Sequence, residues 1–175
     1  MKRKIILGVT SSIAIYKSCS LARALVKRGA EVKTIMTEAA TKFISPLLFE
    51  NLTHNQAYVD LFALEDYDLR HISLAEWADV LIVAPCTANT LSKIALGLSD
   101  NLLTSVVLAF PPQKPIIIAP AMNNQMWENK IIQGHYQVLQ KSLRYKIIGP
   151  KEGILASGRK GWGVMADIEE IITAL

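Results

Sequence analysis

The sequence predicts a doubly wound α/β domain, in which helices cover both faces of a mostly parallel, Rossmann- or flavodoxin-like sheet. Two patterns predict this fold class. Short runs rich in β-branched residues alternate with amphipathic helical stretches, and those runs are continuously apolar, as strands buried on both faces are. The length of 175 residues suits a single domain. We therefore expect three layers, with the sheet between two layers of helices.

The first half of the chain alternates strands and helices. Lys4–Val9 predicts a strand, and Ser12–Arg28 carries apolar residues at spacings of three and four, which is typical of an amphipathic helix. Gly29 fits the position just past the end of that helix. Four segments follow: a strand at Glu31–Met36, a short helix at Pro46–Leu52, an extended piece at Tyr58–Phe62 and a short helix at His71–Ala78.

The second half repeats this alternation. Buried apolar strands are predicted at Val80–Ala84 and Ile116–Ala119. Between them, Thr90–Phe110 predicts a helical stretch that is interrupted near Gly97–Asn101 and ended by the prolines that follow. The chain closes with a helix at Met126–Leu143, a strand at Tyr145–Ile148 and a helix at Ile168–Leu175.

Composition excludes several classes of protein. A hydrophobic share of 51% with 19% charged residues excludes a disordered chain, and the apolar runs are too short for a membrane span. The net charge of +4 comes from scattered basic residues, so we expect no nucleic-acid partner. Cys19 and Cys86 have no metal-ligand spacing, so we expect free thiols, no metal site and a cytoplasmic location.

Four segments are predicted to lie at the carboxyl ends of strands, where doubly wound sheets bind ligands. Gly8–Ser12 offers hydroxyls and free N–H groups to an anion, although a simple helix cap by Ser11 or Ser12 explains it equally well. Met36–Ala40 places a hydroxyl at a similar junction, where a helix cap is the more common role.

The other two segments are richer in polar groups. Pro85–Thr90 has three hydrogen-bonding side chains in four positions, which is more than one helix cap needs. Pro120–Trp127 combines methionines and a tryptophan with three carboxamides. Met and Trp are more often core residues, but together with the amides they indicate an apolar slot with polar groups that read a ligand.

These segments resemble the motifs of a known family. Pro85–Thr90 resembles P-A-S-A-N-T and Pro120–Trp127 resembles P-x-M-N-x-x-M-W, both typical of the homo-oligomeric flavin-containing cysteine decarboxylases. The likeness covers nearly the whole chain and includes Gly8–Ser12, Met36–Phe43, His71–Ala75 and Asp100–Thr104. Within the family the chain is most similar to the coenzyme A biosynthesis branch. We expect one decarboxylase domain over residues 1–175, with no ligase domain attached.

The resemblance implies FMN as cofactor. It implies that the flavin is contacted by Thr10, Ser11, Ser12, Thr37 and Phe43, that its phosphate and ribityl side are held by Thr87, Ala88, Asn89 and Thr90, and that its ring is bordered by Ala121 and Met122. It also implies a homo-oligomer, a trimer or a multiple of trimers. The expected partner is a small phosphorylated thiol substrate, with no membrane involved.

The implied reaction converts 4′-phosphopantothenoylcysteine to 4′-phosphopantetheine. Flavin oxidises the thiol-bearing carbon, CO2 leaves, and the reduced flavin returns the hydride. His71 matches the family's active-site histidine, as a base or a group that orients the carboxylate, and Asn123 matches an asparagine that binds substrate. Taken alone, a histidine at a helix start is more often a surface or capping residue, and an asparagine after a strand is more often a turn residue.

Ser157 departs from the family pattern. Residues 151–165 are expected to form a flexible, glycine-rich substrate flap, in which coenzyme A enzymes carry an acidic cysteine within L-A-C-G. Serine is a far weaker acid than a thiol of pKa about 8.5, so the last step of the reaction is in doubt. Three explanations fit: a Cys-to-Ser replacement, an oxidative decarboxylase of a peptide C-terminal cysteine that stops at the enethiol, or protonation by another group.

Two further functions stay open. Flavin prenyltransferase is one, because residues 85–87 have a faint likeness to its P-C-S segment, although the intact motif at Asn123–Trp127 argues against it. A non-catalytic flavin-binding regulatory subunit is the other, and the presence of both His71 and Asn123 argues against that role.

Overall fold

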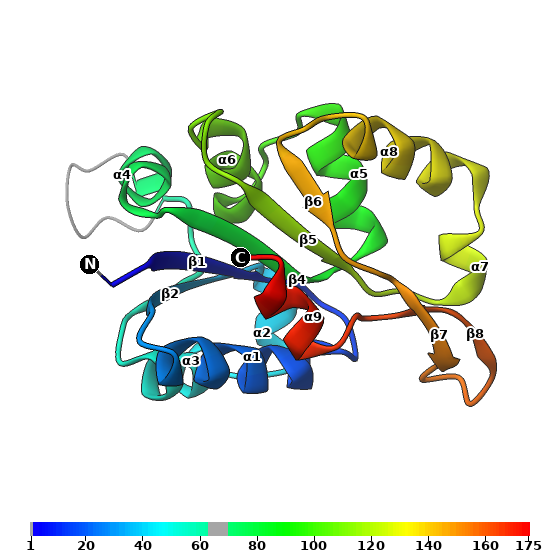
Figure 1. Cartoon of the computed structure of the whole chain (residues 1–175), viewed down its shortest axis with the longest axis horizontal. Helices are drawn as coiled ribbons and strands as arrows, with labels where there is room; N and C mark the ends of the chain where they lie inside the picture. The colour runs from blue at the N-terminus through cyan, green and yellow to red at the C-terminus, as the bar shows by residue number, and fades with distance from the viewer. Residues whose placement is uncertain (1, 63–69) are drawn as a thin grey trace.

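A six-stranded sheet forms the centre of the computed structural model, which describes residues 2–62 and 70–175. The strands run in the order β3-β2-β1-β4-β5-β6, and every neighbouring pair is parallel. Helices pack on both faces of this sheet (Figure 1). The predicted fold class, a doubly wound α/β domain of three layers, is confirmed.

The sheet strands and the helices have the following bounds. The strands are β1 (Lys4–Val9), β2 (Glu31–Met36), β3 (Ala57–Tyr58), β4 (Val80–Cys86), β5 (Ile116–Pro120) and β6 (Tyr145–Ile147). The helices are α1 (Ile15–Lys27), α2 (Glu38–Thr41), α3 (Pro46–Thr53), α4 (Arg70–Trp77), α5 (Ala88–Leu96), α6 (Leu102–Ala109), α7 (Asn124–Trp127), α8 (Lys130–Gln140) and α9 (Ile168–Thr173). Within the described residues, no helix has the length and hydropathy that crossing a bilayer requires.

Two hydrophobic cores hold the layers together, one on each face of the sheet. Because side chains alternate along a strand, Ile5 and Leu7 of β1 pack towards α1, α3 and α9, whereas Ile6 packs towards α4, α5 and α6. These three side chains are at most 1% exposed. Each contributes about 1.5–3 kcal/mol through burial. Both cores leave the carboxyl ends of β1, β4 and β5 free for polar loops.

Two element predictions are wrong. A single helix over Met126–Leu143 was expected, but the chain forms α7 and α8 with a break between them. Asn129 causes the break because its side-chain Oδ1 accepts the N–H of Ile131 at 2.9 Å and caps α8. The extended piece expected at Tyr58–Phe62 is also shorter, because β3 ends at Tyr58.

Residues 151–165 contain an antiparallel hairpin that the sequence patterns did not predict. It consists of β7 (Lys151–Ile154) and β8 (Lys160–Val164) and lies beside α7, beyond the end of the sheet (Figure 1). Lys151 pairs with Val164 and Glu152 with Trp162, so Gly163 is the extra residue of a β-bulge. The flexibility expected of this segment stays a prediction.

Gly163 docks the base of the hairpin on the loop after β5. Its φ of +136° is one that residues with a side chain rarely adopt. The N–H of Met122 donates to the Gly163 carbonyl at 3.0 Å, and a Cβ on Gly163 would lie 2.0 Å from the Met122 carbonyl oxygen. Glycine is therefore required at this position both by the backbone conformation and by the close approach of the two backbone segments.

Candidate functional site

A cavity of about 610 Å³ lies beyond the carboxyl ends of β1, β4 and β5. Its volume is in the range of small-molecule sites. Three strand-end loops, the start of α1 and the hairpin line it. The structure brings together nine of the predicted site residues in this lining: Ser11, Ser12, Thr87, Ala88, Asn89, Ala121, Met122, Asn123 and Ser157.

Thr10 joins two of the loops that form the cavity. It is only 1% exposed and does not itself line the cavity. Its Oγ1 donates to the Pro85 carbonyl at 2.8 Å and accepts the N–H of Thr87 at 3.0 Å. A single hydroxyl thus fixes the loop after β1 against the loop after β4.

We expect Thr10→Val to lower the free energy of unfolding by about 1–3 kcal/mol, because valine has the same shape but leaves two backbone groups without a partner. Urea unfolding followed by circular dichroism measures this difference. Thr10→Ser, which keeps the hydroxyl, is the matched control and should cost less. Equal stability of Thr10→Val and the unmodified protein would contradict the role assigned to this hydroxyl.

The hydroxyls of Ser11 and Ser12 do not cap α1. The residue before this helix is Ala14, which has no side-chain cap, and Ser12 Oγ only accepts the Ala14 N–H at 3.3 Å. Within the described residues, no hydrogen bond uses the Ser11 hydroxyl. The simple helix-cap interpretation therefore does not account for Ser11, which lines the cavity with a free hydroxyl.

In the loop after β4 and the start of α5, some polar side chains stabilise the fold and others line the cavity. Thr87 caps α5 through its Oγ1, which accepts the N–H of Thr90 at 3.4 Å. Thr90 is 3% exposed and lies behind the lining. Asn89 is exposed and lines the cavity, and its side chain forms no hydrogen bond within the described residues. Asn89 is therefore available to a ligand.

Asn123 combines a capping role with a free donor. Its Oδ1 accepts the N–H of Gln125 at 2.9 Å and caps α7. Asn124 and Gln125 belong to α7 itself. No hydrogen bond in the described part of the chain uses the Nδ2 group of Asn123. This amide can therefore donate to a substrate in the cavity.

Besides Thr10 and Thr90, three more predicted site residues do not line the cavity. Thr37 caps α2 by accepting the Ala40 N–H at 3.3 Å, and Phe43 is 49% exposed just after that helix. His71 is half-buried on α4, which packs on the face of the sheet opposite to α1. The roles assigned to these residues stay predictions.

Similarity to known proteins decides the family. The Flavoprotein family model matches residues 1–175. The chain belongs to the Flavoprotein family. It is 44% identical over 173 residues to the probable phosphopantothenoylcysteine decarboxylase of Streptococcus mutans, covering 98% of this chain and 96% of that protein. It is 42% identical to the coenzyme A biosynthesis bifunctional protein of Bacillus subtilis, of which it spans 41%, with 97% of this chain covered.

Solved structures of similar proteins share the fold. A phosphopantothenoylcysteine (PPC) decarboxylase with a cysteine-to-serine mutation, in complex with pantothenoylaminoethenethiol, has a TM-score of 0.88 and 34% identity over 99% of this chain and 96% of that one. The FMN-binding protein AtHal3 has a TM-score of 0.83 and 33% identity, over 99% and 95% of the two chains.

Several residues that line the cavity were not predicted as site residues from the sequence. The lining includes an exposed apolar rim of Ile13, Tyr16, Met126 and Ile154, of which Met126 belongs to the apolar slot predicted at Pro120–Trp127. Lys17 also lines the cavity, at the third position of α1. Tyr16 and Lys17 follow Ile13 by three and four residues, so all three lie on one face of the helix that begins just after Gly8–Ser12. This helical spacing is the signal that could have found them.

Cys86 is excluded as an acid of the site. It is fully buried at the end of β4, packs in the core beneath α5 and does not line the cavity. Burial raises the pKa of the Cys86 thiol because the thiolate would lose its hydration. This thiol therefore stays neutral and serves as a small apolar side chain.

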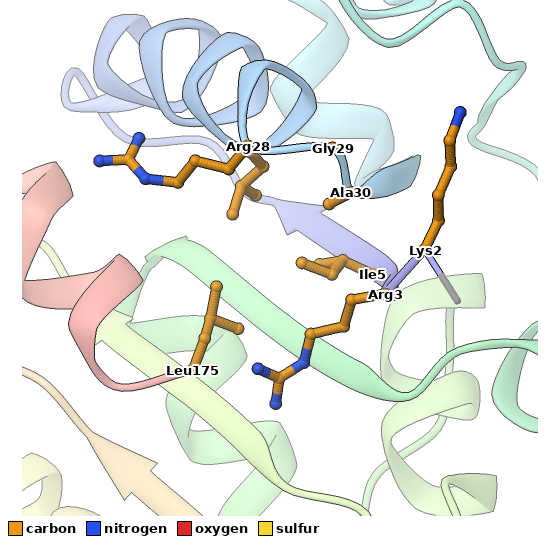
Figure 2. A pocket seen from close by; sticks show the side chains of 8 residues that line it. Lys2, Arg3, Ile5, Arg28, Gly29, Ala30 and Leu175 are labelled. Atoms are coloured by element: carbon orange, nitrogen blue, oxygen red, sulfur yellow. The ribbon is translucent and has the colours of Figure 1, made fainter.

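A second cavity, of about 520 Å³, lies near the amino end of β1 and holds none of the predicted site residues. It is lined by Lys2, Arg3 and Arg28, and Figure 2 shows their charged ends pointing in different directions. Arg28 is already paired with Glu169, with Nη2–oxygen distances of 2.8 and 3.0 Å. The three cations do not converge on one ligand, so the cavity at the carboxyl ends remains the candidate site.

Proposed function

We propose that this protein is an FMN-dependent decarboxylase that converts 4′-phosphopantothenoylcysteine to 4′-phosphopantetheine in coenzyme A biosynthesis. The observation that carries this proposal is the convergence of both family motifs and the hairpin serine on one cavity. The 44% identity to the probable phosphopantothenoylcysteine decarboxylase of Streptococcus mutans over nearly the full length of both chains supports the choice of substrate.

The residues of the cavity fit FMN. Ser11 and Asn89 offer polar groups that have no partner among the described residues, and the described lining contains no carboxylate that would repel a phosphate. Ala121 and Met122 give the apolar border that a flavin ring needs, and Thr10, although it does not line the cavity, holds the loops in place. FMN supplies the reversible hydride acceptance that this decarboxylation requires.

The remaining site residues bind and orient the substrate. The free Nδ2 of Asn123 donates to its carboxylate or amide, and His71 orients the carboxylate or acts as a base. Ser157 lies at the exposed tip of the hairpin and lines the cavity, in position to contact the thiol end of the substrate. Residues 151–165 act as the substrate flap, with a docked base and an exposed tip.

A homotrimer completes the site. His71 lies outside the cavity of its own chain, and the mouth of that cavity has a rim of exposed apolar side chains, Ile13, Tyr16, Met126 and Ile154. A second copy that covers this rim would bury apolar surface and bring its own His71 to the cavity. The free thiols of Cys19 and Cys86 fit a cytoplasmic location.

We expect two inactive variants to restore activity when their subunits are mixed. His71→Asn and Asn123→Asp should each lose about 10²-fold or more of the decarboxylation rate. If the two residues act from different chains, a mixed oligomer contains some sites with both residues intact, and part of the rate returns. A rate in the mixture no higher than in the separate variants would place both residues in one chain.

Flavin content and product mass test the proposed function. The purified protein should be yellow, or should become so with FMN, and should release CO2 from 4′-phosphopantothenoylcysteine. A protein that does not take up added FMN would contradict the proposal. Ser157 favours oxidative decarboxylation as a second function, and mass spectrometry separates the two. Loss of CO2 alone indicates the redox-neutral reaction, whereas loss of CO2 and two hydrogens, with consumption of oxygen, indicates the oxidative one.

A further inference from the structure

Lys17 supplies a positive charge to the wall of the cavity. Among the described residues that line it, Lys17 is the one with a charged side chain at neutral pH, and no carboxylate shares the lining. The side chain is only 20% exposed. The nearest carboxylate oxygen among the described residues, Asp167 Oδ1, is 4.0 Å from its Nζ, so this largely buried cationic side chain favours a negatively charged occupant.

The partners of Lys17 inside the protein leave it incompletely neutralised. Its Nζ donates to the Met165 carbonyl at 3.1 Å, whereas Asp167 Oδ1 is 4.0 Å away, too far for a hydrogen bond. Asp167 instead binds Lys151 at 2.6 Å. This hydrogen bond, with a smaller contribution from Lys17, holds the pKa of Asp167 below its usual value. Of the three N–H donors of Lys17, one is used within the described residues.

We propose that Lys17 is an anion-binding residue of the cavity, whose ammonium group binds a phosphate or carboxylate of the molecule that occupies it. The inference rests on the proposed function, because both FMN and the phosphorylated thiol substrate carry such a group. Lys17 also holds the Met165 carbonyl, next to Val164 at the base of the hairpin. The bound anion and the hairpin base therefore share one cation.

The test compares three variants. Lys17→Gln removes the charge, and Lys17→Arg keeps it. Lys27→Gln is the matched control, because it removes the same charge from the exposed last turn of the same helix, away from the cavity. The apoprotein is titrated with inorganic phosphate, FMN and riboflavin, and the flavin-loaded protein with 4′-phosphopantothenoylcysteine. Thermal unfolding of each variant is measured without ligand.

We expect Lys17→Gln to weaken binding of inorganic phosphate and of one anionic ligand by about 10- to 100-fold, while the other two variants change it by less than about threefold. A larger loss for FMN than for riboflavin identifies the cofactor phosphate as the bound anion. Unchanged flavin affinities with a raised KM identify the substrate.

Two results would overturn the inference. One is that Lys17→Gln binds phosphate, FMN and substrate as the unmodified protein does. The other is an equal loss of FMN and riboflavin with a lower melting temperature, which shows that Lys17 only holds the hairpin. If the unmodified protein takes up no FMN, the proposed function fails, and the titration of the apoprotein with inorganic phosphate still decides the role of Lys17.

Discussion

Ser157→Cys should raise the rate at which the saturated thiol product forms by about 10²- to 10⁴-fold, which is the usual contribution of a general acid. A thiol of pKa about 8.5 gives up its proton far more readily than a serine hydroxyl. Because Ser157 lines the cavity from the hairpin, a cysteine there would be placed to protonate the decarboxylated enethiolate. Single-turnover mixing with product analysis by mass spectrometry measures the rate.

Ala156→Cys is the matched control for this substitution. Ala156 precedes Ser157 in the hairpin and also lines the cavity, so it adds the same thiol one residue away. We expect a gain of less than about tenfold from Ala156→Cys, since proton transfer depends on position. If the unmodified protein already forms the saturated product as fast as Ser157→Cys, another group is the acid and position 157 does not limit the reaction.

Gly163→Ala should lower the free energy of unfolding by about 2–5 kcal/mol and weaken FMN binding by about tenfold or more. The added Cβ would lie 2.0 Å from the Met122 carbonyl oxygen, in a backbone conformation that alanine rarely adopts. The hairpin base must then move, and it takes Val164 and the loop at Met122 out of the cavity wall. Urea unfolding and fluorescence titration with FMN measure the two effects.

Two other glycines separate the causes of this effect. Gly158→Ala has a positive φ of +78° but open space around its Cβ, so it should cost about 1–2 kcal/mol from backbone strain alone. Gly134→Ala lies within α8, with neither strain nor a contact, and should stabilise the protein by up to about 1 kcal/mol. If Gly163→Ala lowers the free energy of unfolding by no more than Gly158→Ala does, the contact with Met122 does not constrain this position.

The sheet could be predicted because its strands are local patterns. Lys4–Val9 and Glu31–Met36 were predicted with the bounds that the structure has, since an apolar β-branched run between turn residues has few alternatives. The helix break at Asn129 was missed. The residues around it continue a helical pattern of apolar spacing, so only the capping geometry of one side chain marks the break.

The candidate site was predictable where its residues follow strands and not where it depends on distant contacts. Ser11, Asn89 and Asn123 meet because parallel strands end at one edge of the sheet. The bond between Thr10 and Thr87 joins residues 77 positions apart, and Gly163 meets Met122 through a bulge. Neither contact leaves a periodic signal in the sequence, because each arises from tertiary packing.

The docking of the hairpin through main-chain groups has a consequence for how such proteins can diverge. The base is held by a backbone hydrogen bond between Met122 and Gly163, which does not depend on the side chains of the tip. Residues 156–159 are exposed and lie outside both cores. The tip can therefore be exchanged as a cassette, so that a new substrate preference or acid is acquired while the flavin-binding scaffold beneath it is kept.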